Sequence, residues 1–209
     1  MALGNIWGGD VSALTSSADG RLYAGMASGA ISRSLDGMSW KLLSRTKSGQ
    51  GVTALTATSG PMTVIVRAVE REGLQVSDDD GHTWRQSGRG FGDDTVTALG
   101  QAGDGALLYV ATANHGVYVS RDIGRHWRSA NTGLPTLSIS CLLATTAGGD
   151  RLFVGTSSGG VFVLFPGETR WLRMNQGLSS LGGQTLTVGT DPGVLYCAMD
   201  SMVYQCRIP

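Results

Sequence analysis

The stretch Ser77-Asp78-Asp79-Asp80-Gly81-His82-Thr83-Trp84 combines the residue types of a tight polar turn with a tryptophan at its end. The Ser77 hydroxyl and the Asp79 carboxylate can accept hydrogen bonds from turn N–H groups. Gly81 permits a left-handed backbone conformation, and the Trp84 indole can cover the base of a hairpin. The stretch therefore predicts a structural turn that leads into a strand opening with Trp84.

The same turn recurs along the chain with different degrees of completeness. The stretch 120–127 keeps the spacing of serine, aspartate, glycine and tryptophan, while 34–40 keeps these residue types but is one residue shorter. The stretch 165–171 keeps the tryptophan and little else. We assign the following residues to structural turns: Ser34, Asp36 and Trp40; Ser77, Asp79, Gly81 and Trp84; Ser120, Asp122, Gly124 and Trp127.

Four of the five tryptophans follow a fixed period. Trp40, Trp84, Trp127 and Trp171 are 44, 43 and 44 residues apart, and a period of this length is typical of a repeat architecture. Between them lie short runs rich in β-branched and aromatic residues, bounded by Gly, Asp, Asn and Ser, which predict strands joined by tight turns. Four strands in a repeat of this length indicate a propeller blade, so we expect an all-β fold.

The two ends of the chain predict how the repeats close. The fifth repeat supplies three strand-like runs before Pro209, and Ala2–Trp7 has the character of the fourth strand that it lacks. Pairing of that segment with the last blade ties down both chain ends and removes an exposed sheet edge. We therefore expect a single domain over residues 1–209. It is a five-bladed β-propeller of four-stranded antiparallel blades, with the ring closed by the N-terminal strand that completes the last blade.

Composition excludes several classes of function. Basic and acidic residues both number 16, so no net charge draws the chain to nucleic acid or to an anionic membrane. No apolar stretch is long enough to span a bilayer, and no secretory signal is visible at the start of the sequence. We expect a soluble monomer without a cofactor, of unassigned compartment.

The cysteines and histidines indicate neither a disulfide framework nor a metal site. Three cysteines are too few for a fold built on disulfides. Cys197 and Cys206 are expected nearly opposite each other on neighbouring strands, so a cross-strand bridge and free thiols are both compatible with the sequence. The three histidines fall in separate turns without the spacing of metal ligands, and we expect no metal.

The serine–aspartate–glycine–tryptophan turns resemble the Asp-box, also called the bacterial neuraminidase repeat. With the phrases Asn131–Pro135 and Asn175–Leu178, the repeat is similar to the Asp-box propellers of xyloglucanases, sortilin-type receptors and photosystem II stability/assembly factors. The resemblance covers nearly the whole chain and implies a propeller fold. In those families the box is a structural turn away from the ligand face, which implies that Asp79 and Asp122 have no catalytic role.

The catalytic constellations of enzymes that resemble this repeat are incomplete in the sequence. A sialidase-like site needs three arginines that converge from several blades, but the densest arginine cluster, within 67–89, falls in one repeat and its exit loop. A xyloglucanase-like site needs two carboxylates across a cleft, whereas the adjacent Asp93 and Asp94 are expected to diverge. We therefore assign no catalytic residue. A small glycoside hydrolase of sialidase-like or xyloglucanase-like ancestry stays as the alternative function.

The loops that leave each fourth strand and the turns between second and third strands share one face of a propeller. These loops differ between repeats, as Arg45–Lys47 and Asn131–Gly133 illustrate, which disfavours one identical sugar site per blade. Phe91, flanked by glycines, can act as an anchor for a partner, although a solvated loop with scattered ion pairs is the simpler interpretation of the charges around it. For His115 the simpler role is turn geometry.

We predict a non-catalytic module that binds a protein or carbohydrate partner through this face. The candidate ligand-binding residues are Arg71, Arg89, Phe91, Asp93, Asp94, His115, Asn131 and Asn175.

Overall fold

The computed structural model describes residues 9–17, 19–58, 63–88, 94–102, 107–145, 150–179, 181–189, 191, 193–200 and 202–208. All regular elements within these residues are strands, and they pair antiparallel in five sheets. The predicted all-β fold is therefore confirmed. The segment Ala2–Trp7, predicted as the last fourth strand, lies outside the described residues. The described elements include no helix that is long and apolar enough to cross a membrane.

Each sheet corresponds to one sequence repeat, and the sheets follow one another in chain order. The first sheet holds β1 (Val11–Ser16), β2 (Leu22–Met26), β3 (Ala30–Ser34) and β4 (Trp40–Arg45). The second holds β5 (Val52–Ala57), β6 (Ile65–Val69), β7 (Gly73–Ser77) and β8 (Arg85–Ser87). The third holds β9 (Val96–Ala102), β10 (Leu107–Thr112), β11 (Gly116–Ser120) and β12 (Arg128–Ser129). The fourth holds β13 (Ile139–Thr145), β14 (Arg151–Thr156), β15 (Gly160–Leu164) and β16 (Leu172–Arg173), and the last holds β17 (Gly183–Val188), β18 (Val194–Met199) and β19 (Met202–Arg207).

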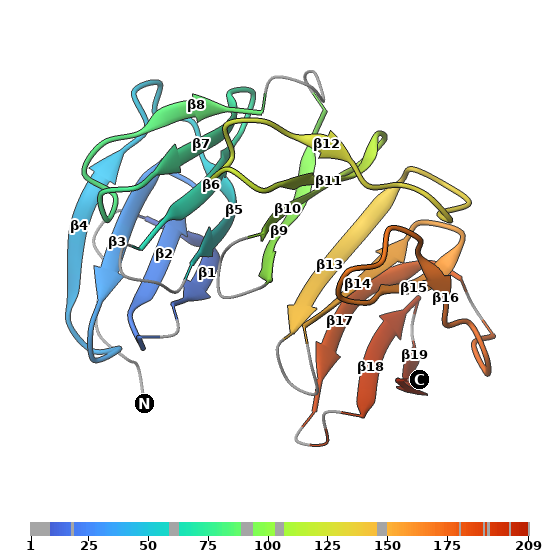
Figure 1. Ribbon diagram of the computed structural model, residues 1–209. Coiled ribbons are helices and arrows are strands. Elements are labelled where there is room, and N and C mark those ends of the chain that lie inside the picture. Colours follow the sequence, from blue (N-terminus) through green and yellow to red (C-terminus); the bar gives the residue numbers. More distant parts are fainter. Residues whose placement is uncertain are drawn as a thin grey trace.

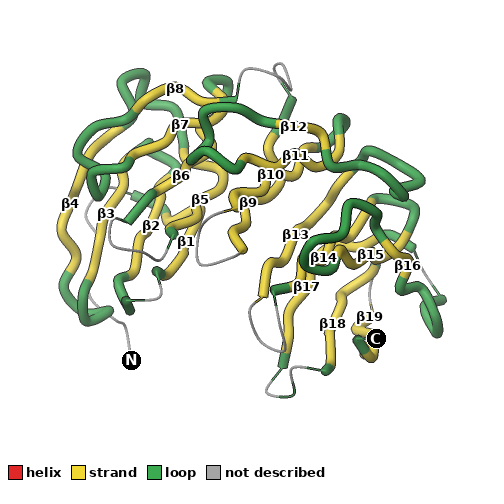
Figure 2. The backbone as a smooth tube through the Cα atoms, viewed as in Figure 1, coloured by secondary structure: helices red, strands yellow, loops and turns green. Residues whose placement is uncertain are grey.

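The five sheets stand side by side in an arc, with the first strand of each sheet toward the inside (Figure 1). Neighbouring sheets meet through these strands, so that β1 contacts β5, β5 contacts β9, β9 contacts β13 and β13 contacts β17. No comparable contact joins β17 to β1 within the described part of the chain, and the two end sheets stand apart in Figures 1 and 2. The predicted closure of the ring is thus not seen in these residues.

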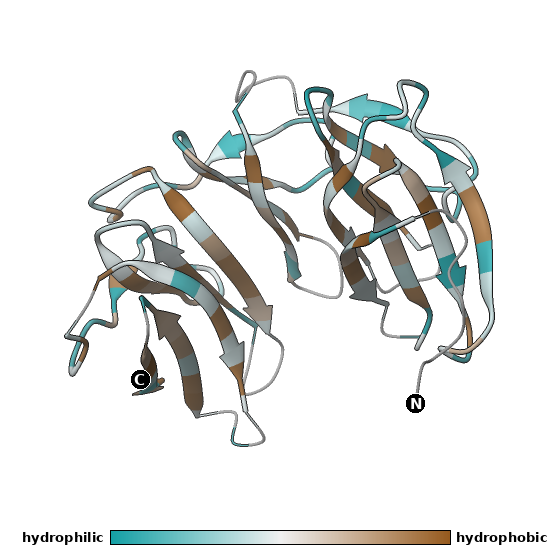
Figure 3. Ribbon diagram, turned by 180° about the vertical axis from the view of Figure 1, so that it is seen from behind, coloured by the Kyte–Doolittle hydropathy of each residue, from teal (hydrophilic) through white to brown (hydrophobic). Residues whose placement is uncertain are grey.

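Apolar side chains fill the spaces between successive sheets, so the core consists of layers and not of one central cluster. In Figure 3 most strands carry apolar residues along their length, whereas the short strands β8 and β12 and many connections are polar. The layers are close enough to require small residues on the second strands. A Cβ at Gly25 would lie 2.6 Å from Val52 of the next sheet, and one at Gly155 would lie 3.4 Å from the Gly183 Cα of the next sheet. A larger residue at either glycine forces the sheets apart.

The three cysteines are free thiols. Cys197 pairs across the strands with Tyr204, and Cys206 pairs with Leu195. The predicted opposition of the two cysteines is therefore wrong by two residues; they lie diagonally, with their sulfurs 3.7 Å apart. Burial raises the pKa of the Cys197 thiol to about 12, and the neighbouring Cys206 adds to the shift. The Cys197 thiol is consequently protonated and unreactive at neutral pH.

Candidate functional site

The turns between third and fourth strands, at 34–40, 77–84 and 120–127, define what we call the box end of the sheets. In the second sheet, Ser77 Oγ accepts from Gly81 N at 2.8 Å and donates to Asp79 at 2.7 Å. Asp79 accepts from the main-chain N–H of Thr83 at 2.8 Å and from its hydroxyl at 2.6 Å. The turn at 120–127 repeats this pattern. The carboxylates of the boxes are thus engaged by their own turns.

Two of the boxes contain a backbone feature that the sequence did not predict. Asp80 and Ile123 have φ angles of 58° and 59°, directly before Gly81 and Gly124 at 85° and 71°. The shorter turn of the first sheet has Gly37 alone in this region, at 74°. The additional residue of the longer box therefore takes a left-handed conformation, which residues with a Cβ adopt only at a cost in free energy.

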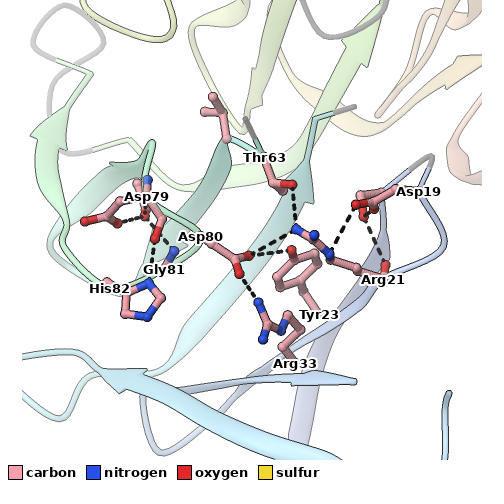
Figure 4. A network of polar contacts seen from close by, with 12 residues as sticks. Asp19, Arg21, Tyr23, Arg33, Thr63, Asp79, Asp80, Gly81 and His82 are labelled. Atoms are coloured by element: carbon pink, nitrogen blue, oxygen red, sulfur yellow. Dashed lines mark hydrogen bonds and ion pairs between the residues drawn. The ribbon is translucent and has the colours of Figure 1, made fainter. Parts of the chain in front are cut away.

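Asp80 uses this conformation to bind the first sheet (Figure 4). Its carboxylate accepts from the Tyr23 hydroxyl at 2.7 Å and pairs with Arg33. Arg21 lies 4.0 Å from the same carboxylate and bonds to Asp19 at 3.1 Å. Every charge in this cluster has a partner within it, so we assign it to the contact between the two sheets and not to a ligand.

Three of the repeating tryptophans also connect their sheet to the one before it. The indole N–H donates to a group in or next to the preceding fourth strand: Trp84 to Ser44 Oγ (2.9 Å), Trp127 to Ser87 Oγ (3.0 Å) and Trp171 to Ala130 O (2.6 Å). The regular spacing of tryptophan therefore reflects a contact between sheets, in addition to the cover of the hairpin base that the sequence predicted.

The opposite end of the sheets, which we call the loop end, carries the turns between second and third strands and the loops between sheets. Asn131 Oδ1 accepts from Val117 N at 2.7 Å, and its Nδ2 donates to the His115 carbonyl at 3.1 Å. Asn175 makes the equivalent bonds to Val161 N at 2.8 Å and to the Gly159 carbonyl at 2.7 Å. The amide groups of both asparagines therefore join a loop to a neighbouring turn.

Asp94 and His115, two further candidates, meet at the turn between β10 and β11. Asp94 accepts from Asn114 N at 2.8 Å, His115 N at 3.0 Å and His115 Nδ1 at 2.9 Å. Its side chain is 2% exposed, whereas that of His115 is 57% exposed. Burial opposes ionisation of Asp94, but the hydrogen bonds from His115 and Asn114 outweigh it and hold its pKa well below the usual range. Asp94 is thus a fixed anion that caps this turn.

A cavity of about 520 Å³ lies at the loop end beside the second sheet. Its walls come from the β6–β7 turn at 70–73, the end of β8 at 86–88 and the entry to β9 at 94–96. Arg71 stands in this wall with 81% of its side chain exposed and a φ of 60°. A non-glycine residue held in the left-handed region is often found where function requires it. The structure therefore brings the predicted residues Arg71 and Asp94 to one cavity.

A chain of hydrogen-bonded side chains that begins at the buried Arg67 holds Glu72 in the cavity wall. Arg67 is 2% exposed and donates through Nε and Nη2 to Gln75 Oε1, at 2.9 and 2.6 Å. Gln75 Nε2 then donates to Glu72 Oε2 at 2.9 Å. The Arg67 guanidinium stacks over the Trp84 ring at 3.8 Å. Burial lowers the pKa of Arg67 to about 10 and the charge of Glu72 partly offsets this, so Arg67 stays a cation at neutral pH.

Three of the predicted site residues fall outside the part of the chain that the structure describes. Arg89, Phe91 and Asp93 lie outside the described residues, so their place at the cavity stays a prediction. Glu72 was not predicted as a site residue, although its position in a turn between second and third strands was a usable signal. Gln86, at the end of β8, had no comparable signal. Within the described ranges, no group of three or more His, Cys, Asp or Glu side chains is placed to hold a metal ion.

No protein-family model matches the sequence, and no curated protein matches it significantly. Solved structures do resemble it. A GH74 enzyme from Niastella koreensis superposes with a TM-score of 0.72 at 17% identity, covering 90% of this chain and 33% of that chain. The GH74 xyloglucanase from Xanthomonas campestris gives a TM-score of 0.65 at 17% identity, covering 93% and 36%.

YCF48 bound to D1 peptide is also similar, with a TM-score of 0.67 at 14% identity, covering 93% of this chain and 63% of that chain. This chain thus spans less than two thirds of the length of each of these proteins. All three are propeller proteins, so the predicted propeller type of fold is confirmed. At such low identity the likeness shows the fold alone.

Proposed function

We propose that this chain is a non-catalytic binding or scaffold propeller that engages a protein or carbohydrate partner at the cavity beside the second sheet. The cavity itself carries the proposal: it measures about 520 Å³, within the range of small-ligand sites, and lies at the end where the loops differ between sheets. Glu70 and Arg71 present side chains that are 54% and 81% exposed at its edge. The box end, in contrast, is occupied by its own hydrogen bonds.

In this proposal each of the five sheets acts as one propeller blade. Closure of a five-bladed ring by Ala2–Trp7 stays a prediction, and deletion of residues 1–8 tests it. If that segment closes the ring, its deletion removes a strand and exposes two sheet faces, and the melting temperature falls steeply. If the arc is open, the deletion has little effect.

The structural neighbours support two classes of partner. One neighbour is bound to a peptide, and two are GH74 enzymes, one of them named as a xyloglucanase. The cavity edge suits either class, because Arg71 can pair with a carboxylate and can also stack on a planar group.

A small glycoside hydrolase of sialidase-like or xyloglucanase-like ancestry is the alternative. Hydrolysis requires two carboxyl groups that face the glycosidic bond. In the cavity, Asp94 is held by the β10–β11 turn and Glu72 accepts from Gln75. We therefore expect no cleavage of a panel of fluorogenic glycosides. Cleavage that disappears in Glu70→Gln would reverse the assignment.

Arg71→Ala and a matched control separate binding from folding. Arg125 is also an exposed arginine, but it lies at the box end. Titration calorimetry with xyloglucan oligosaccharides and with acidic peptides should show one class binding, and Arg71→Ala should weaken it by about tenfold or more. Arg125→Ala should leave both affinity and melting temperature unchanged. An Arg71→Ala variant that binds with the same affinity as the natural chain would place the binding site elsewhere.

A further inference from the structure

Trp40 departs from the pattern of the other box tryptophans. Its Nε1 is buried and finds no acceptor among the described residues. For Trp84, the acceptor Ser44 belongs to the fourth strand of the preceding sheet. The described chain contains no sheet before the first one. A buried N–H without a partner is costly, so the position of Trp40 indicates an acceptor that comes from outside the described sheets.

The first strand of the first sheet, β1, also differs from its equivalent in the second sheet, β5, because its apolar side chains are exposed. Leu14 is 63% exposed, whereas its equivalent Leu55 is 7% exposed; Val11 is 47% exposed, whereas Val52 is 1% exposed. The residues are matched by their strand register. β1 and β5 each have a shift in register between the valine and the alanine two residues later. Val52 and Leu55 are buried by the sheet before them. The outer face of the first sheet therefore has the composition of a face between two sheets.

The last sheet cannot by itself complete this face. Its described residues form three strands and make no contact with β1 comparable to those between successive sheets. Closure of the ring by Ala2–Trp7 would cover the same face, so it and the docking surface proposed below exclude each other. A second copy of the chain that docked its last sheet here would cover Leu14 but leave the Trp40 indole without its acceptor. The occupant must be a sheet with a fourth strand.

We propose that the outer face of the first sheet is a docking surface for a four-stranded partner blade of the same repeat. That blade carries glycine or alanine in the middle of its second strand, to receive Val11 as Gly25 receives Val52. It carries a hydroxyl or carbonyl at the end of its fourth strand, to accept from Trp40 Nε1. The contact continues the interface that already joins successive sheets along the arc, and burial of Leu14 and Val11 drives it.

A chain extended by one of its own blades tests the proposal. Residues 95–138, which contain the third sheet and Ala130, replace residues 1–10 directly before Val11. The extended chain should melt about 3 °C or more above the natural chain. Trp40→Phe should lower the melting temperature of the extended chain by more than that of the natural chain. Trp84→Phe is the control, because its acceptors are present in both chains and its effect should be equal in both.

Leu14→Asp distinguishes the partner blade from other occupants. The substitution should leave the natural chain unchanged and destabilise the extended one. A natural chain that sediments as a dimer, and as a monomer with Leu14→Asp, would assign the face to a second copy. A lower melting temperature of the natural monomer with Leu14→Asp would show that its own residues cover the face. An added blade that proteases remove, without any gain in melting temperature, would also overturn the proposal.

Discussion

The box end and the loop end are built on the same strands but use polar side chains in different ways. At the box end, carboxylates such as Asp79 and Asp122 accept from their own turns, and the pattern repeats between sheets. At the loop end, side chains such as Asn131 and Asp94 reach a turn distant in sequence. Asn175 repeats the bonds of Asn131, but Asp94 bonds to the β10–β11 turn of the third sheet and the loop sequences differ between repeats. Repetition therefore marks the end that maintains the fold, and variation marks the end available to a partner.

Gly160→Ala should have the largest effect on the loop end. Gly160 has a φ of 92°, and a Cβ there would overlap the Asn175 amide. We expect a loss of about 3 kcal/mol of unfolding free energy, from backbone strain and displaced hydrogen bonds. Gly177→Ala is the control, because Gly177 has a φ of 82° but no atom of the described residues within 4 Å of its Cβ position, and should lose about 1 to 2 kcal/mol. Equal losses in urea denaturation would contradict the crowding at Gly160.

Asp79→Asn should have the next largest effect, at the box end. It replaces a charged acceptor of three N–H or O–H groups, and a loss of about 2 kcal/mol is expected. Partner binding at the loop end should not change. Weaker binding at a temperature where the variant is folded would show that the two ends are coupled.

The ionisation of Asp79 also predicts a pH dependence. Burial opposes its ionisation, but hydrogen bonds from Thr83 and Ser77 outweigh it and lower its pKa to about 2. Because the folded pKa is below the unfolded value of about 3.9, this stabilisation is present above about pH 4 and is lost as the pH falls toward 2. Thermal melts from pH 5 to 2 should therefore show a smaller acid loss in Asp79→Asn than in the natural chain. Parallel curves would contradict the assigned pKa.

Alanine substitutions at two serines test how much two of the tryptophan contacts between sheets contribute to the free energy of unfolding. Ser87→Ala removes the acceptor of Trp127 Nε1 and a donor to the Gly124 carbonyl, so a loss of about 1 to 2 kcal/mol is expected. Ser44→Ala should lose less than about 1 kcal/mol, because Trp84 Nε1 also donates to the Gly81 carbonyl at 3.1 Å. Denaturant titration of both variants measures the difference, and the reverse order would argue against these contacts.

Arg71→Gly should have the smallest effect on stability, and in the opposite direction. Glycine adopts the φ of 60° without strain, so the unfolding free energy should rise by up to about 1 kcal/mol. The same change removes the guanidinium and should weaken partner binding. A variant that is less stable than the natural chain would show that the Arg71 side chain makes a stabilising contact.

The local features were predictable because each depends on neighbouring residues. The strands, the turn at Ser77–Trp84 and the loop-end position of Arg71 follow from alternation, turn chemistry and repeat period. The joining of Asp94 to the β10–β11 turn was not predictable, because its partners Asn114 and His115 are twenty or more residues away. The same holds for the hydrogen-bonded chain from the buried Arg67 to Glu72, since it depends on which strand faces are covered.

By itself the amino-acid sequence determined the repeat, its four-strand unit and the turns that punctuate it, since these depend on interactions within a few tens of residues. Tertiary structure decided how the sheets join. The angle between sheets depends on side chains that meet from different repeats, such as Val52 against Gly25 and Trp84 against Ser44. The same tryptophan motif is therefore a completed bond in the second sheet, whereas in the first sheet Trp40 Nε1 has no acceptor among the described residues.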